Sequence, residues 1–373
     1  MKIIQRSNVR SFILGAALLA GLGHVTHATA REYFLIDLNS RTATYFGSKT
    51  YVSGINAAGQ MAGQSPTAEG DNHAFITGPD GRSMRDLGTL GGNGSGAQGI
   101  NNAGQVVGWA RTKEGFEHAF ITGPDGMGMR DLGTLGGDYS MAEGINDAGQ
   151  LAGFSGFAEG NWRYHAFVTG PDGMGVRDLG TFGGDRSAAH SINNAGQVAG
   201  EARTKEGVEH AFITGPDGVG MRDLGTLGGD YSIAEGINDT GQVVGGSETT
   251  GSITRAFITG PDGMGMRDLG ALGESWSWSY ARSINDVGQV VGESYTTAEG
   301  GNRAFITGPD GMGMVDLNSL VDVPQGLILS DATYISNNGQ VFASAIPELQ
   351  TYALMLAGLG LVGFVAGRNR PVA

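Results

Sequence analysis

The sequence contains Gly99-Ile100-Asn101-Asn102-Ala103-Gly104-Gln105-Val106-Val107-Gly108, one of seven related copies of a ten-residue element. The isoleucine of the copies stands at positions 55, 100, 145, 192, 237, 284 and 335, so the spacings are 45, 45, 47, 45, 47 and 51 residues. A nearly constant period of this size is typical of repeat architectures. The chain is therefore predicted to form one array of similar units, each packing against its neighbours.

One unit, residues 140–184, consists of four short extended runs separated by glycine-rich turns. The runs are residues 141–146, 150–153, 165–169 and 176–180. The turns are Asn146-Asp147-Ala148-Gly149 and Gly170-Pro171-Asp172-Gly173, in which Gly accepts positive φ and Pro presets φ near −65°. No run is long enough for a helix, so each unit is predicted to hold four strands and no helix.

Four strands in each unit of this length match the blade of a β-propeller. We therefore expect an all-β fold of tandem four-stranded repeats, with a β-solenoid as the less fitting alternative. Seven blades are predicted, although six or eight are compatible with the pattern. An Asp-Leu run occurs seven times, counting Asp37, but an Ala-Phe run only six times. An N-terminal strand is therefore expected to complete the last blade, with residues 33–38 pairing with residues 42–46.

The composition excludes several classes of protein. The chain has 373 residues, a formal net charge of −14, 68 glycines and no cysteine. The glycines lack the every-third-residue period of collagen. The acidic balance, without a basic cluster in the repeat region, argues against nucleic acid as a partner. Without cysteine there is neither a disulfide framework nor a thiolate metal site.

The first thirty residues have the features of an export signal. Lys2, Arg6 and Arg10 precede a short apolar run, residues 12–23, and Ala28-Thr29-Ala30 provides a small-x-small cleavage pattern. We predict a signal peptide over residues 1–30, with an uncleaved anchor as the alternative. The repeat domain is expected over residues 31–344.

The repeats resemble the HAF family of bacterial extracellular repeat proteins. The motif that carries the resemblance is His-Ala-Phe, intact at His73-Ala74-Phe75, His118-Ala119-Phe120, His165-Ala166-Phe167 and His210-Ala211-Phe212. Arg replaces His at positions 255 and 303, and the match covers nearly all of residues 33–343. The resemblance implies an exported β-repeat protein, and it brings no established catalytic residues.

The C-terminal segment, residues 345–373, resembles a PEP-CTERM sorting signal. Pro347 and Glu348 precede about 15 apolar residues, and Arg368 and Arg370 follow them. Leu349 stands where the second proline of the motif belongs. The resemblance implies an exosortase-type processing protease, transient inner-membrane anchoring and a Gram-negative envelope or extracellular matrix. An ordinary C-terminal anchor is the alternative.

The residues common to most copies are interpreted as structural. The motif histidines fall on different blades, so they are not expected to share a metal ion. The aspartates of the Gly-Pro-Asp-Gly turns lack the alternating acidic ligands of a calcium loop. The recurring Arg-Asp pairs, such as Arg130-Asp131, should find partners across strands or blades, because adjacent strand residues point to opposite faces.

The variable polar position two residues before each isoleucine is the first candidate binding site. If the strand that carries it is innermost, its side chains line a central channel, and Glu143, His190, Glu235 and Arg282 form a functional ring. A solvated strand face is the alternative. The corresponding residues of the other copies are Ser53, Gln98 and Thr333.

The second candidate is an aromatic run. Trp276, Trp278 and Tyr280 alternate with serine, which places all three on one strand face if the run is extended. Aromatic rings stack on sugars, although these residues could instead wedge between blades.

These patterns favour an exported, non-enzymatic protein of the cell surface or matrix that binds polysaccharide or another protein. No Gly-x-Ser-x-Gly elbow, phosphate loop or cofactor motif occurs in the sequence. The alternatives are a secreted glycan-active hydrolase or lyase, and a purely structural matrix component.

Overall fold

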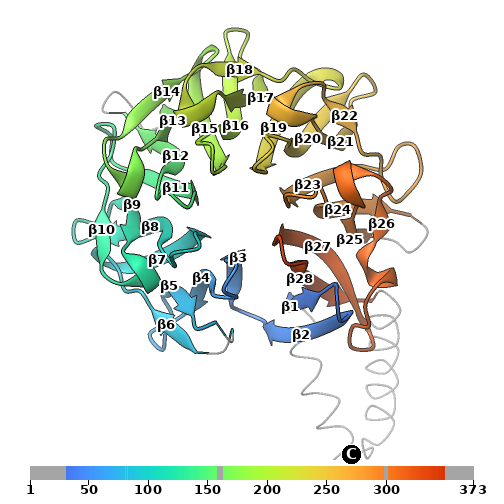
Figure 1. Cartoon of the computed structure of the whole chain (residues 1–373), viewed down its shortest axis with the longest axis horizontal. Helices are drawn as coiled ribbons and strands as arrows, with labels where there is room; N and C mark the ends of the chain where they lie inside the picture. The colour runs from blue at the N-terminus through green and yellow to red at the C-terminus, as the bar shows by residue number, and fades with distance from the viewer. Residues whose placement is uncertain (1–30, 80, 82, 158–162, 298–300, 349–373) are drawn as a thin grey trace, which may run out of the picture.

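The computed structural model describes residues 31–79, 81, 83–157, 163–297 and 301–348. Seven four-stranded antiparallel sheets stand around a common axis as a closed ring, as Figure 1 shows. The predicted all-β propeller with seven blades is confirmed. The predicted signal peptide and most of the predicted sorting segment lie outside the described residues.

Each of the first six blades follows the chain from its innermost strand to its outermost. Blades I to III are β3 (Tyr51–Ile55), β4 (Met61–Pro66), β5 (Asn72–Thr77) and β6 (Met84–Asp86); β7 (Gly91–Ile100), β8 (Val106–Thr112), β9 (Glu117–Thr122) and β10 (Met129–Asp131); and β11 (Ser140–Ile145), β12 (Leu151–Gly156), β13 (Tyr164–Val168) and β14 (Arg177–Gly180). Blades IV to VI are β15 (Gly183–Ile192), β16 (Val198–Thr204), β17 (Glu209–Thr214) and β18 (Met221–Asp223); β19 (Gly228–Ile237), β20 (Val243–Thr249), β21 (Thr254–Ile258) and β22 (Arg267–Asp268); and β23 (Ser279–Ile284), β24 (Val290–Thr296), β25 (Gly301–Ile306) and β26 (Val315–Asp316).

Blade VII closes the ring with strands from both ends of the chain. Its inner strands are β27 (Leu327–Ile335) and β28 (Gln340–Pro347), and its outer strands are β1 (Glu32–Asp37) and β2 (Thr42–Gly47). β1 pairs with β28 from Glu32↔Ala345 to Asp37↔Gln340, and β2 pairs with β1. The predicted completion of the last blade by an N-terminal strand is confirmed.

Two details of the sequence interpretation are wrong. Asp37 ends the third strand of its blade, whereas the other aspartates of the Asp-Leu runs belong to outer strands, as Asp131 does. Asp37 and Asp316 both begin the sequence Asp-Leu-Asn-Ser, and a similar Asx turn follows each of them. The propeller also continues past residue 344, because β28 pairs with β27 through Pro347, so the first residue of the predicted sorting motif belongs to the ring.

Short 3-10 turns replace most of the outer hairpin loops. They are η1 (Pro124–Gly126), η2 (Pro171–Gly173), η3 (Pro216–Gly218), η4 (Pro261–Gly263) and η5 (Pro309–Gly311), and a sixth, η6 (Leu317–Ser319), follows β26. The aspartate of each of the first five turns has a left-handed backbone conformation, with φ between 52° and 55°. These are the Gly-Pro-Asp-Gly sequences that were predicted to turn the chain.

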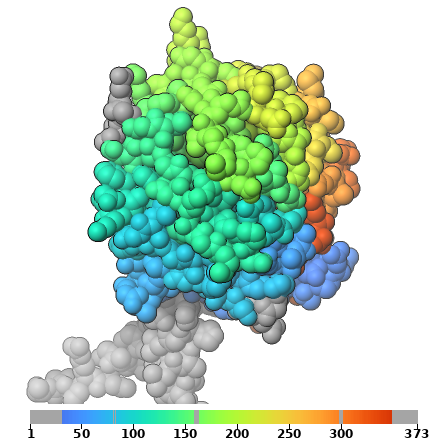
Figure 2. All heavy atoms as spheres, turned by 60° about the vertical axis from the view of Figure 1, so that its left-hand side comes forward, coloured from blue at the N-terminus to red at the C-terminus, as the bar shows by residue number. Residues whose placement is uncertain are grey.

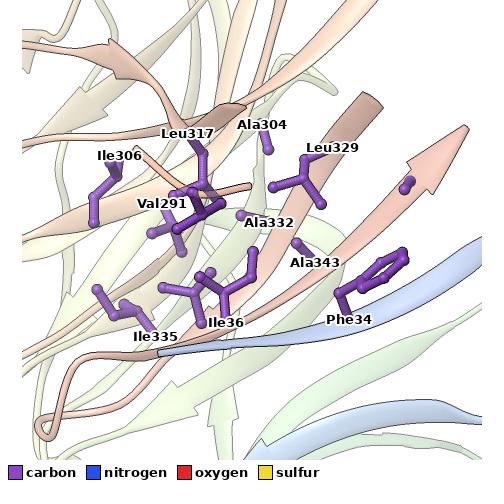
Figure 3. Packing of buried hydrophobic residues seen from close by; sticks show 13 residues of the cluster. Phe34, Ile36, Val291, Ala304, Ile306, Leu317, Leu329, Ala332, Ile335 and Ala343 are labelled. Carbon is purple, nitrogen blue, oxygen red and sulfur yellow. The ribbon is translucent and has the colours of Figure 1, made fainter. Parts of the chain in front are cut away.

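The hydrophobic core lies between blades. Seven clusters of buried apolar side chains occur in the described residues, and each combines residues of two neighbouring blades. In Figure 3, Phe34 and Ile36 of β1 lie beside Ala332 and Ala343 of blade VII and face Val291 of blade VI. On the side that Figure 2 shows, the outer wall runs without a break from blade to blade.

The Ile-Asn turns form a series of hydrogen bonds between successive blades from I to VI. In blade IV, Asn193 Nδ2 donates to the backbone oxygen of Asn238 in blade V at 3.0 Å, and to Gln197 Oε1 in its own turn at 2.8 Å. Asn193 Oδ1 accepts from two backbone N–H groups of the same turn. Gly196 closes the turn with φ of 74°, where a Cβ atom would lie 2.9 Å from the backbone nitrogen of Asp217.

The other repeated polar residues also join strands and blades. His118 Nδ1 lies 2.9 Å from Asp131 Oδ2 of the adjacent strand. The neighbouring Arg130 donates to the backbone oxygen of Asp172 in the next blade. The prediction that the Arg-Asp pairs find partners across strands or blades is confirmed. These residues therefore hold the ring together.

Among the described residues, no helix has the length and apolarity needed to cross a bilayer.

Replacing Ile36 by Ala tests the ring closure. Ile36 is fully buried at the interface of blades VI and VII. The substitution should therefore lower the free energy of unfolding by about 2–5 kcal/mol. Thr44→Ala on the exposed part of β2 should change it by less than about 0.5 kcal/mol. Urea unfolding measures both, and equal effects would contradict the closure by β1.

Replacing Asn193 by Ala tests the inter-blade hydrogen bonds. The substitution leaves the backbone oxygen of Asn238, the buried N–H of Gln197 and the partly buried N–H of Ala195 without these partners, so it should cost about 2–3 kcal/mol. Asn194→Ala, at the exposed next position, should cost less than about 1 kcal/mol. The same urea experiment measures both variants, and a smaller loss for Asn193→Ala than for Asn194→Ala contradicts the assignment.

Candidate functional site in the central channel

The variable polar residue of each inner strand occupies a β-bulge. In blade III, Ala142 pairs with Gly153 and Gly144 with Ala152, so Glu143 has no partner in the ladder. The same break in register occurs at the equivalent position of the other six inner strands. A bulge re-aims a side chain and removes it from regular pairing. The sequence therefore varies at the position where the ladder is interrupted.

These seven side chains converge on the channel along the ring axis. The channel encloses a cavity of about 340 Å³ at the end formed by the Ile-Asn turns. The bulge residues line it: Ser53, Gln98, Glu143, His190, Glu235, Arg282 and Thr333. The structure thus brings together the four residues that the sequence analysis proposed as a functional ring. Figure 1 shows the inner strands facing this axis.

His190 is held as a cation on the channel wall. Its Nε2 contacts Glu201 Oε2 of the adjacent strand β16. Burial alone would lower the pKa of His190, but the charge and hydrogen bond of Glu201, with the charges of Glu235 and Glu143, raise it to about 10. The imidazolium is therefore the charged partner of three carboxylates at neutral pH.

Arg282 is the second cation and joins three blades. Its Nη2 lies 2.6 Å from Glu293 Oε1 in blade VI, and its Nη1 lies 4.0 Å from Glu235 Oε1 in blade V. Its Nε lies 3.8 Å from Asp331 Oδ1 in blade VII, and neither of these two buried atoms has a hydrogen-bond partner among the described residues. The guanidinium carbon also lies 4.8 Å from the centre of the Tyr280 ring.

Two acidic side chains of the channel hold a proton more strongly than usual. Burial raises the pKa of Glu143, and the nearby carboxylates Glu235 and Glu201 add to the effect, against the charge of His190. Burial and the charge of Glu293 raise the pKa of Asp331 to about 6. Five carboxyl groups thus face two cations along the arc of blades III to VII, whereas Ser53 and Gln98 of blades I and II leave the opposite wall uncharged.

The channel is suited to a small polar ligand. Its wall offers carboxylates as hydrogen-bond acceptors and Arg, Gln and protonated His as donors, so it can satisfy the hydroxyl groups of a sugar. The excess of carboxylates opposes an anionic group. Among the described residues, no cluster of His, Asp or Glu is arranged to hold a metal ion.

The aromatic run is not one extended strand face. Ser275 and Trp276 lie in a turn, and the strand starts at Ser279, so the prediction of three rings on one face is wrong. Trp276 is 54% exposed, with its ring 6.3 Å from that of Tyr295. Trp278 is half-buried before the strand. Tyr280 donates from its hydroxyl to Glu235 Oε1 at 2.8 Å, so it belongs to the channel network.

Glu201, Glu293 and Asp331 are channel residues that the sequence analysis missed. Glu201 and Glu293 stand at equivalent positions of β16 and β24, directly after the repeat glycine. Gln64, Trp109, Phe154 and Gly246 occupy the same position elsewhere. This second variable position was visible in the sequence and could have identified them. Asp331 lies in a blade whose inner strand departs from the repeat pattern.

No protein-family model matches this chain, and no curated protein sequence matches it. Among solved structures, the chain is similar to the β-propeller domain of the trilobed protease from Pyrococcus furiosus, described as having an open velcro topology (TM-score 0.52, 10% identity, 78% of this chain and 91% of that chain). It is also similar to a putative TolB from Agrobacterium tumefaciens (TM-score 0.50, 11% identity, 85% and 99%). A third similar structure is an oligogalacturonate lyase from Vibrio parahaemolyticus (TM-score 0.50, 8% identity, 85% and 97%). At these identities the likeness establishes the β-propeller fold.

The titration of His190 tests the channel electrostatics. Since its pKa of about 10 lies above the ordinary 6.5, the imidazolium stabilises the fold fully below pH 6.5, and this stabilisation is lost as the pH rises through about 10. His190 should therefore stay protonated at pH 8 in an NMR titration of the imidazole Cε1–H signal. Glu201→Gln should lower its pKa, and the difference in melting temperature between the two proteins should narrow above pH 10.

The control is Glu209→Gln, which removes a carboxylate that pairs with Arg186 outside the channel. It should leave the His190 titration unchanged. A His190 signal that titrates near pH 6.5 in the unaltered protein contradicts the assignment.

Proposed function

We propose that the chain is an exported, non-enzymatic propeller of the cell surface or extracellular matrix that binds polysaccharide through its channel. The observation that carries the proposal is the collection of all seven variable bulge side chains in one polar cavity of about 340 Å³. The residues common to the repeats form the bonds between blades, so they are committed to the fold. Ligand selection therefore falls to the residues that differ.

The chemistry of the wall favours a hydroxyl-rich ligand without a negative charge. Glu143 faces the cavity, where it has a hydrogen bond with the side chain of Gln98 and lies near the charge of His190. Its carboxyl group can accept from or donate to a hydroxyl. Arg282 and His190 are neutralised by neighbouring carboxylates, so they do not attract a free anion strongly. A neutral saccharide fits these groups better than an acidic one.

The course of the chain supports attachment on the side away from the channel mouth. β1 begins and β28 ends at the edge of blade VII opposite the Ile-Asn turns, because Glu32 pairs with Ala345. The cavity opens among the Ile-Asn turns. If the C-terminal apolar segment is the sorting signal that its sequence resembles, the channel mouth faces away from the anchored end. The basic-apolar pattern of residues 1–30 and the resemblance to HAF repeats support export of the whole chain.

A glycan-active hydrolase or lyase is the second candidate, because Glu143 combines a raised pKa with exposure to the cavity. Such a carboxyl group has the property of a general acid. We prefer the binding function because the two carboxylates near Glu143 already have partners. Glu201 contacts His190, and Glu235 contacts Tyr280 and Arg282.

Binding of neutral oligosaccharides to the purified chain tests the function. A glycan array selects the ligand, and calorimetry measures its affinity. Glu143→Gln should weaken binding about tenfold, which is about 1.4 kcal/mol, because it removes a carboxyl group that forms hydrogen bonds with ligand hydroxyls. Glu117→Gln is the matched control, since Glu117 pairs with Arg111 on the outside of the ring.

Equal affinities of the two variants contradict binding in the channel. Chromatography of the incubated ligand distinguishes the candidates, because shortened products that disappear in Glu143→Gln support the enzyme instead. Absence of both binding and turnover across the array supports a purely structural matrix component.

A further inference from the structure

A second cavity lies between blades III and IV, outside the channel. It encloses about 710 Å³ and is lined by Phe157 and Arg163 at the base of the β12–β13 loop, and by Arg203 and Lys205 of blade IV. These residues lie where second strands end and third strands begin, at the edge opposite the Ile-Asn turns. The cavity therefore opens on a different face from the channel.

The aromatic side of this cavity is held in place by contacts within blade III. The Phe157 ring packs edge-to-face on the His165 ring, with centroids 4.5 Å apart. His165 Nδ1 is fixed 3.0 Å from Asp178 Oδ2. Phe157 N donates to the backbone oxygen of Arg163 at 3.3 Å, which ties the two ends of the loop together. The backbone hydrogen bond thus fixes the positions from which the Phe157 and Arg163 side chains extend.

The other side of the cavity is basic. Arg203 is fixed by Asp185 Oδ1 at 3.1 Å and by the backbone oxygen of Gly207 at 2.8 Å. Lys205 and Arg163 are exposed, and neither has an ion-pair partner among the described residues. Both carboxylates that line the cavity, Asp178 and Asp185, are already paired. Two cations without an ion-pair partner among the described residues therefore line the cavity together with an aromatic ring, on a chain whose net charge is −14.

The seam between blades I and II provides an internal comparison. Arg111 and Lys113 of blade II occupy the places of Arg203 and Lys205. Across the seam, however, Thr67 and Asp71 stand where blade III has Phe157 and Arg163, with the same backbone hydrogen bond between them. Asp71 accepts from Asn93 Nδ2 at 3.0 Å. In the seam of blades I and II, the pair of basic residues thus lies opposite an acidic residue. In the seam of blades III and IV, the equivalent pair lies opposite an aromatic ring and a further cation.

We infer that the cavity between blades III and IV binds a carboxylate-bearing sugar of an acidic polysaccharide. Lys205 and Arg163 attract and bind the carboxylate, which Arg can hold through two parallel hydrogen bonds. Phe157 offers its ring to the apolar face of the sugar. This site is separate from the channel and does not depend on the function proposed for it.

Calorimetry of the full chain with two matched ligands tests the inference. The ligands are a cello-oligosaccharide and the same oligosaccharide oxidised to carboxylate at C6, so they differ only in charge. The oxidised ligand should bind at least about tenfold more tightly, and added salt should weaken it. Lys205→Ala and Phe157→Ala should each weaken it about tenfold, and Lys113→Ala, the counterpart in blade II, by less than about twofold.

Three outcomes would overturn the inference. They are equal affinity for the neutral and oxidised ligands, equal effects of Lys205→Ala and Lys113→Ala, and absence of binding. Inorganic phosphate is the further probe: if it competes at the same concentration as the oxidised ligand, the cavity is a simple anion site and the sugar assignment is wrong. Circular dichroism of each variant confirms that the β-propeller is intact before its affinity is compared.

Discussion

The structure depends on the hydrogen bond from the asparagine side chain of one blade to the backbone of the next. A single blade has no core of its own, because each cluster of buried side chains needs two blades. Alanine and glycine at the interfaces let the sheets approach closely but supply little apolar area. Bonds such as Asn193 to Asn238 fix the register of the blades at the channel end. The first six copies carry Asn at this position, whose side chain both donates and accepts, and in blade VII the hydroxyl of Ser336 accepts the corresponding bond from Gln340 N within its own turn.

The same constraint explains where the chain can vary. A residue within the ladder of an inner strand packs against two blades, so changing it disturbs both. The bulge removes one residue per blade from the ladder and turns it toward the channel, outside the apolar clusters between blades. Glu143, His190, Glu235 and Arg282 could therefore diverge while their neighbours stayed alike. A repeat protein of nearly identical units gains a differentiated site in this way.

Most of the fold could be predicted from the repeat, but only part of the site. The period and the turns gave four strands per blade, and the unequal counts of two motifs gave the closure by β1. No particular residue type marks the β-bulge in the sequence, so the convergence of Glu143 and His190 on the channel could be proposed only conditionally. Glu201 reaches the channel network from a second variable position, on β16, which the sequence shows but which was not interpreted, and Asp331 reaches it from the neighbouring blade VII, where the repeat pattern gives no guide. The segment before the inner strand of blade VI is two residues longer than in blades II to V, and Ser275 and Trp276 form a turn before Trp278, which an alternating pattern alone cannot reveal.

The two cavities differ in charge, and this difference would separate the two ligands that we propose for them. In the channel the cations are each bound by carboxylates, and the remaining acids oppose a negative ligand. Between blades III and IV the lining carboxylates are paired, and two cations have no ion-pair partner in the part of the chain that the structure describes. Because the chain as a whole is acidic, an anionic polymer is repelled from most of its surface and is attracted only where basic residues gather. A polymer with both neutral and acidic sugars could thus contact both faces, with each cavity taking the residue that the other rejects.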